Sequence, residues 1–223
     1  MKNNYKIVSI HIPKTGGTSV RSVLQNWFGN SFYFYRKKNI ERYPLLKLIL
    51  PLLLFNKKMI HGHLDAANLR ILKRHISKNH IKILLLRNPL DVQISKFYQL
   101  HRRLEKKLYI SKANKKELEF ISDIDTYISN TSSNILRYLP ENLNSINYKQ
   151  VIDSEYEIVG VLDYLQEYVD KLAEILNKPK QNVPWKLQTS NKKQPSDQTI
   201  SNFTDRHSLE YEVYNYILSK YKK

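Results

Sequence analysis

The stretch from Tyr5 to Phe28, YKIVSIHIPKTGGTSVRSVLQNWF, decides the fold of this chain. Lys6 to Ile12 is rich in β-branched residues, which is typical of a buried strand in a parallel sheet. Residues 18–28 are predicted to be helical, because their apolar residues recur at helical spacing and form one face. These residues are Val20, Val23, Leu24, Trp27 and Phe28.

The loop between strand and helix, Pro13 to Gly17, predicts a cradle for a phosphate or sulfate group. Gly16 and Gly17 permit positive φ angles and close backbone approach, so N–H groups at the helix N-terminus can converge on an anion. Lys14 adds a cation, and Thr15, Thr18 and Ser19 add hydroxyl groups. The order differs from a Walker A loop, in which the lysine follows the second glycine. An ordinary strand-to-helix turn that contains glycine is the alternative interpretation.

The composition favours one domain with an anionic partner. A chain of 223 residues is long enough for a full core, so we expect a single domain over residues 1–223. Lys and Arg total 37 against 20 Asp and Glu, a net charge of +17, which suits a nucleotide, a nucleic acid, an acidic glycan or an anionic membrane. Because there is no cysteine, disulfides, thiolate catalysis and cysteine-ligated zinc are excluded.

The N-terminal segment is not typical of a signal peptide, since His11, Pro13 and Lys14 interrupt its apolar run. No run reaches the roughly 20 apolar residues of a membrane span. We therefore expect a cytoplasmic protein.

The most apolar stretch, Tyr43 to Phe55, is broken by prolines and a lysine and predicts a packed core segment. Peripheral contact with an anionic membrane, flanked by Lys57 and Lys58, is the alternative.

Two further motifs contain groups suited to binding or catalysis. Arg87 follows the predicted strand Ile81–Leu86, at the carboxyl end where parallel sheets bind ligands, and Ser95 lies about two turns into the helix that starts near Pro89. His61 and His63 flank Gly62 and point to the same side of an extended segment. Their spacing alone is compatible with metal binding or with purely structural histidines, because no third ligand stands at a recognisable spacing.

The remaining pattern alternates strands and helices. A third strand is predicted at 156–162, and helices at 68–78, 115–129, 165–176 and 204–221, with 130–139 continuing the second of these and a loop over 178–198. This alternation predicts an α/β fold: a three-layer, P-loop-like arrangement with a central, mostly parallel sheet flanked by helices.

Taken together, the motifs Pro13 to Ser19, His61 to His63, and Arg87 with Ser95 resemble those of sulfotransferases that use 3′-phosphoadenosine 5′-phosphosulfate (PAPS). The closest resemblance is to the branch that includes heparan sulfate 2-O-sulfotransferase and its bacterial relatives. Segment 156–161 is similar to the late strand of that family, and 189–193 to its lysine-rich loop over the cofactor.

The resemblance implies transfer of a sulfuryl group from PAPS to a hydroxyl of a glycan or glycolipid, leaving adenosine 3′,5′-bisphosphate (PAP), with no metal. It implies that His63 is the catalytic base, that Lys14 stabilises the leaving phosphate, and that His61 assists. The implied cofactor-binding residues are Lys14, Thr15, Gly16, Gly17, Thr18, Ser19, Arg87, Ser95, Ser190, Lys192 and Lys193. Asn88 departs from the Arg-Asp-Pro of the family, and no acceptor specificity is implied.

Two other functions compete with this interpretation. A nucleotide-dependent kinase would need a Mg²⁺-binding carboxylate, for which Asp65 and Asp91 are the candidates. A non-catalytic binder of nucleic acid or acidic glycan would use the net charge and the 16 tyrosines, but it leaves the ordered motifs unexplained, so we expect no nucleic-acid partner.

Overall fold

A computed structural model describes residues 6–35, 46–73, 80–184 and 192–222. Its centre is a five-stranded parallel sheet in the order β2-β3-β1-β4-β5. The strands are β1 (Lys6–Ile10), β2 (Phe32–Tyr35), β3 (Met59–Gly62), β4 (His80–Leu86) and β5 (Ile158–Val161). The predicted α/β fold with a central parallel sheet is confirmed.

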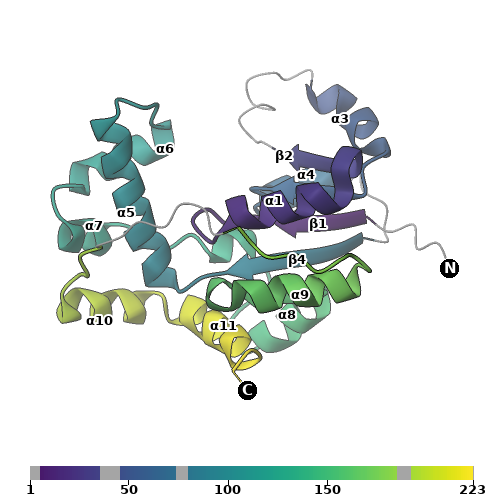
Figure 1. Ribbon diagram of the computed structural model, residues 1–223. Coiled ribbons are helices and arrows are strands. Elements are labelled where there is room, and N and C mark those ends of the chain that lie inside the picture. The colour runs from purple at the N-terminus through teal and green to yellow at the C-terminus, as the bar shows by residue number, and fades with distance from the viewer. Residues whose placement is uncertain (1–5, 36–45, 74–79, 185–191, 223) are drawn as a thin grey trace.

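Helices cover both faces of this sheet (Figure 1). In that view α1 (Gly17–Phe28) and α9 (Leu165–Ile175) lie in front of it, and α4 (Ala66–Lys73) and α8 (Tyr148–Glu155) lie behind. The faces of α1 and α9 that the spacing predicts to be apolar pack into the core: Val23 and Leu24 of α1 and Val169 and Leu172 of α9 are buried. Because side chains pack on both faces, the strands are mostly apolar.

A second cluster of buried side chains lies at the carboxyl end of the sheet. It joins α5 (Pro89–Glu105), α7 (Ile124–Asn130) and α10 (Asp197–Arg206), which form the left-hand part of Figure 1 with α6 (Lys112–Lys115). The last helix, α11 (Ser208–Ser219), contacts β5, α8 and both α5 and α10. These helices therefore enclose the ends of the strands on which the site is built.

Several elements differ from the sequence predictions. The predicted helix at 115–129 is divided: Lys115 ends α6, and a 3₁₀ helix follows at Lys116–Phe120 with Ile121 as its C-cap. α7 begins after extended Asp123, which caps it by accepting from the Thr126 N–H. Residues 130–139 form no α-helix, only a 3₁₀ turn at Leu136–Tyr138. The predicted helix at 68–78 begins earlier, at Ala66, and its residues 74–78 lie outside the described part.

The apolar stretch around residue 50 is a helix, α3 (Leu46–Phe55), that continues through Pro51. Its Leu50 and Leu54 are buried in the main core, as predicted for a packed segment. Among the described residues, no helix is both long and apolar enough for a bilayer crossing.

Candidate active site

The site lies where β1, β3 and β4 end. These three strands are neighbours in the sheet and run in parallel, with Ile10 paired to both Gly62 and Leu84. The loops that follow them therefore meet at one edge. This brings together the three sequence motifs: Arg87 is hydrogen-bonded to Lys14, although 73 positions separate them in the sequence.

The glycine loop has the left-handed backbone that an anion cradle requires. Gly16 has a φ of 81° and Lys14 a φ of 72°. The Thr15 hydroxyl donates to the Ile12 carbonyl at 2.9 Å, and the Ser19 N–H donates to the Gly16 carbonyl at 2.9 Å. Gly17 and Thr18 are the first two residues of α1, so their N–H groups precede the first hydrogen bond of the helix. They therefore lie at the positive end of the helix dipole.

Gly17 is required by a close approach. A Cβ atom at this position would lie 1.9 Å from Nε2 of His11, well inside any permitted contact. The loop consequently packs directly on an imidazole that stands at the end of β1.

Cations converge on Lys14. The Arg87 Nη1 donates to the Lys14 carbonyl at 3.2 Å, which ties the end of β4 to the glycine loop. Burial lowers the pKa of Lys14 to about 8, helped by the charges of Arg102, Arg87, Lys192 and Arg103. Burial and the charge of Arg87 also lower the pKa of Lys192. Positive groups held this close favour a multiply charged anion among them.

One face of α5 continues this cluster. Asp91, Ser95, Tyr98 and Arg102 follow one another at spacings of four, three and four residues, so they share a helical face. Asp91 lies 3.6 Å from Arg87. The Lys193 N–H donates to the Tyr98 hydroxyl at 2.6 Å, so α5 holds the returning C-terminal segment beside the cations.

Three histidines form a stack beside the glycine loop. The ring of His11 stacks on that of His63 at 4.4 Å between centroids and on that of His61 at 5.1 Å. His63 Nδ1 lies 2.9 Å from the His11 carbonyl. Because a carbonyl only accepts, Nδ1 carries the hydrogen and Nε2 of the neutral ring has a free lone pair.

The stack is held uncharged at neutral pH. Burial is the main cause for all three rings: it lowers the pKa of His63, lowers that of His61 to about 3, and lowers that of His11 well below the ordinary value. The charge of Arg21, whose guanidinium lies 4.8 Å from the Phe34 ring, adds to the effect on His11 and His61. A neutral His63 is a proton acceptor at neutral pH.

The structure adds residues that the motifs did not include. The charges of Arg102 and Arg103, near the C-terminal end of α5, contribute to the lowered pKa of Lys14. The ring of His11 stacks on His63, and its carbonyl accepts a hydrogen bond from Nδ1 of His63. The face spacing along α5 is the sequence signal that could have found Arg102. Ser190 lies outside the described residues.

The carboxylates considered for a metal are engaged elsewhere or stand next to arginine. Asp65 lies 2.8 Å from Arg137 and accepts the Asn68 N–H at the start of α4. In the part of the chain that is described, no group of three or more acidic, histidine or cysteine side chains is placed to hold a metal ion.

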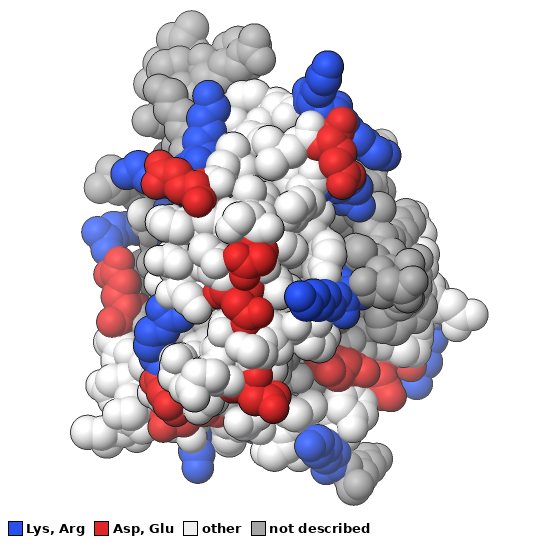
Figure 2. Space-filling view, turned by 90° about the vertical axis from the view of Figure 1, so that its left-hand side faces the viewer, with Lys and Arg blue, Asp and Glu red and all other residues white. Residues whose placement is uncertain are grey.

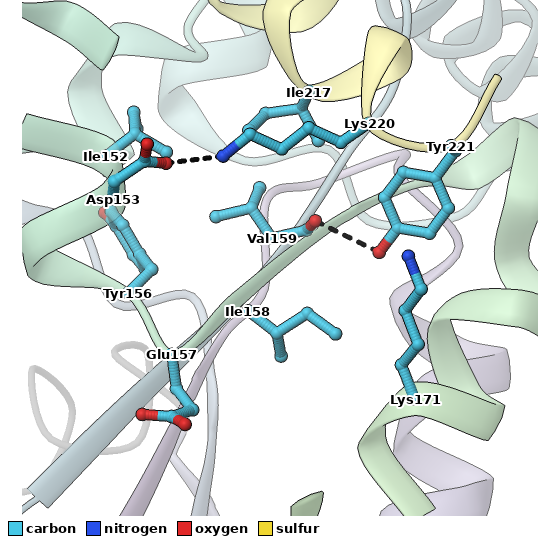
Figure 3. Close-up of a pocket in the computed structure, with 10 residues that line it drawn as sticks. All are labelled: Ile152, Asp153, Tyr156, Glu157, Ile158, Val159, Lys171, Ile217, Lys220 and Tyr221. Carbon is cyan, nitrogen blue, oxygen red and sulfur yellow. Dashed lines mark hydrogen bonds and ion pairs between the residues drawn. The ribbon is translucent and has the colours of Figure 1, made fainter. Parts of the chain in front are cut away.

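A separate cavity of about 260 Å³ lies near the start of β5, away from this edge (Figure 3). Several of its polar groups are paired with one another: Lys220 with Asp153, and the Tyr221 hydroxyl, as donor, with the Val159 carbonyl. It shares no residue with the cation cluster.

The fold and the site together define an α/β protein with a glycine loop and a cluster of cations at the carboxyl ends of neighbouring parallel strands. The chain belongs to the sulfotransferase family, whose sequence model matches residues 1–222. This confirms the class indicated by the three motifs; the heparan sulfate 2-O branch stays a prediction.

Among solved structures the chain is similar to mouse sulfotransferase SULT7A1 complexed with PAP, with 15% identity and a TM-score of 0.42. The match covers 80% of this chain and 61% of the mouse chain. No curated protein sequence matches.

Proposed function

We propose that this protein transfers a sulfuryl group from PAPS to a hydroxyl group of a carbohydrate-type acceptor, with His63 as the base. The observation that carries the proposal is the juxtaposition of the cation cluster around Lys14 with the neutral imidazole of His63, joined through His11 and the glycine loop. Family membership supports the reaction class.

The residues fit a nucleotide that bears phosphates at both ends. The Lys14 pKa of about 8 reflects a burial and repulsion that a bound anion would relieve. The Gly17 and Thr18 N–H groups and the Lys14 ammonium would hold the 5′-phosphosulfate. The Arg87 guanidinium, the Ser95 hydroxyl and Lys192 would hold the 3′-phosphate, because Arg87 and Lys192 lie on the α5 side of the loop.

Bound PAPS supplies the activated sulfuryl group. In this proposal His63 Nε2 takes the proton from the acceptor hydroxyl while its Nδ1–H remains on the His11 carbonyl. The acceptor oxygen then forms the new bond to sulfur as the bond between sulfur and the bridging oxygen breaks. Lys14 stabilises the negative charge that develops on the leaving phosphate, and positioning by the loop supplies the rest.

Two observations support an acceptor site beside His63. Phe34 stacks near His61 at 5.8 Å, and Arg21 lies over the Phe34 ring, so an aromatic face and a cation adjoin the histidines. Such surfaces bind sugar hydroxyls and acidic groups. The carbohydrate class of acceptor follows from the sequence resemblance, which carries over no specificity for a particular glycan; heparan sulfate is the substrate to test first.

The test is a transfer assay with PAPS and desulfated heparan sulfate, in which sulfated product is measured by mass spectrometry. We expect His63→Ala to lower kcat by about 10²- to 10⁴-fold. The same variant should bind PAP as the wild type does, because His63 lies on the acceptor side of Lys14. Normal turnover by His63→Ala would move the base to another residue, and transfer that needs ATP and Mg²⁺ instead of PAPS would refute the reaction.

A further inference from the structure

Helix α3 is apolar on two sides, although only one of them packs against the protein. Leu50 and Leu54 are 1% and 0% exposed and belong to the main core. Ile49, Leu52 and Phe55 are 42%, 76% and 77% exposed. These three recur every third residue, so they form one ridge along the helix, which we call the α3 ridge. A surface helix normally turns polar residues to water, so an exposed ridge of this kind marks an interaction surface.

The charge of the chain is concentrated in the same part of the sequence. Residues 1–64 contain 11 Lys and Arg and a single acid, Glu41, whereas the remaining 159 residues contain 26 Lys and Arg and 19 acids. Figure 2 shows the side of the molecule that carries α5, α7 and α10, and there acidic and basic side chains are interspersed. Lys57 and Lys58 follow α3 after one residue, Asn56, and the Lys6 ammonium donates to the carbonyl of Leu54 near the end of the helix.

We propose that the α3 ridge docks on the surface of an anionic lipid bilayer. Leu52 and Phe55 would enter the boundary between headgroups and acyl chains, and the neighbouring lysines would interact with lipid phosphates. This is a peripheral attachment, consistent with a helix of 10 residues.

Charge complementarity decides among the occupants that would cover an apolar ridge. A symmetric contact between two copies would bring their acid-poor, lysine-rich regions together, which like-charge repulsion opposes. A nucleic acid would suit the lysines but leave the leucine and phenylalanine side chains in water. An anionic bilayer satisfies both features of the surface.

The surface has a defined relation to the site. α3 immediately precedes β3, whose end carries His61 and His63, and it lies near the β2 edge of the sheet in Figure 1. Attachment there would fix that edge at the membrane. Such attachment is independent of the chemistry of the site.

The test is co-sedimentation of the whole chain with vesicles of phosphatidylcholine containing about one third phosphatidylglycerol. We expect the double variant Leu52→Ser/Phe55→Ser to lower the partition coefficient at least about tenfold, and Lys58→Gln to lower it roughly fivefold. Ile146→Ser is the matched control, because Ile146 is 95% exposed in a loop outside α3, and its partitioning should equal that of the wild type. All variants should keep wild-type PAP binding and circular dichroism.

Five results would overturn the proposal. The wild type could remain in the supernatant, it could bind pure phosphatidylcholine equally well, or the double variant could sediment like the wild type. The variant could instead convert a dimer into a monomer by light scattering, which would assign the ridge to a second copy. If Lys58→Gln lost binding to a DNA duplex while its vesicle binding stayed unchanged, the lysines would be assigned to nucleic acid.

Discussion

Lys14 stands at the centre of the electrostatics of the site. Its ammonium is mostly buried and surrounded by guanidinium groups, so the charged form is disfavoured and the pKa falls to about 8. A phosphate placed among these groups reverses the balance and favours the charged form. Binding of PAP should therefore be accompanied by proton uptake when the pH exceeds the pKa of Lys14 in the free protein.

We expect PAP binding at pH 8.5 to take up roughly one half to one proton, because Lys14 is mostly neutral before binding and charged after it. At pH 7 the uptake from Lys14 should be close to zero. Calorimetry in two buffers of different ionisation enthalpy measures the uptake, and Lys14→Met is the control that should abolish it. Equal proton counts at the two pH values would show that Lys14 does not contact the anion.

The pH profile of turnover tests the base. His63 has a lowered pKa, so its neutral, proton-accepting form persists below pH 6.5 and is lost only as the pH falls further. At saturating PAPS, the acid limb of kcat/KM for the acceptor should lie below 6.5 and disappear in His63→Ala. A limb near pH 3 would assign the base to His61, whose pKa is about 3.

The residue types and their order predicted part of this site. The order of proline, lysine and paired glycines after a strand indicated the anion cradle, and the positive φ of Gly16 and the packing of Gly17 on His11 give its physical reason. The contributions of Arg102 and His11 could not be predicted in the same way. Helical spacing places Arg102 on the same face of α5 as Ser95, but only the tertiary packing shows that its charge acts on Lys14. The contact of His63 with the His11 carbonyl involves the main chain and leaves no local sequence pattern.

At the scale of elements, the start of α5 explains the departure of this chain from the Arg-Asp-Pro motif. Asn88 is the N-cap, and its side-chain oxygen accepts from the Leu90 N–H at 3.0 Å and from the Asp91 N–H at 3.3 Å. Asparagine and aspartate cap equally well, so Asn88 keeps the helix start that places Arg87.

Asn88→Ala should lower the free energy of unfolding by about 1 kcal/mol, since the cap is lost. Asn88→Asp should keep the wild-type value within a few tenths of a kcal/mol, because a negative charge at a helix N-terminus is favourable. Urea denaturation of the three proteins gives the comparison. An aspartate variant as unstable as the alanine variant would show that Asn88 has another role.

Periodicity predicted the elements with long apolar patterns and missed the short or mixed ones. β1, β4, α1, α5 and α9 lie where the patterns placed them, within a few residues. β2 is an edge strand of four aromatic residues, so it lacks the alternation of polar and apolar residues that marks a strand. α8 and α10 carry too few apolar residues for a clear helical periodicity. β2 and α10 are stabilised mainly by tertiary contacts, to β3 and to α7 respectively.

At the scale of the whole molecule, the site joins two cores. The main core fixes the three strand ends, and the second core, of α5, α7 and α10, fixes the helix face that carries Ser95 and Tyr98. The segment from Lys192 to Ser196 is hydrogen-bonded to two helices of the second core. The Lys193 N–H donates to Tyr98 of α5, and the Ser196 N–H donates to Asp125 of α7 at 2.8 Å. Composition could predict an anionic partner, but only this arrangement shows where the cations meet.

The most direct test of the central claim is calorimetric titration of the wild type and Arg87→Ala with PAP and with AMP, which lacks the 3′-phosphate. The wild type should bind PAP at least about a hundredfold more tightly than AMP, because charged hydrogen bonds to the 3′-phosphate add to those of the loop. Arg87→Ala should lose most of that preference while its affinity for AMP stays within about twofold of the wild type. Equal affinity of the wild type for the two nucleotides would contradict the account.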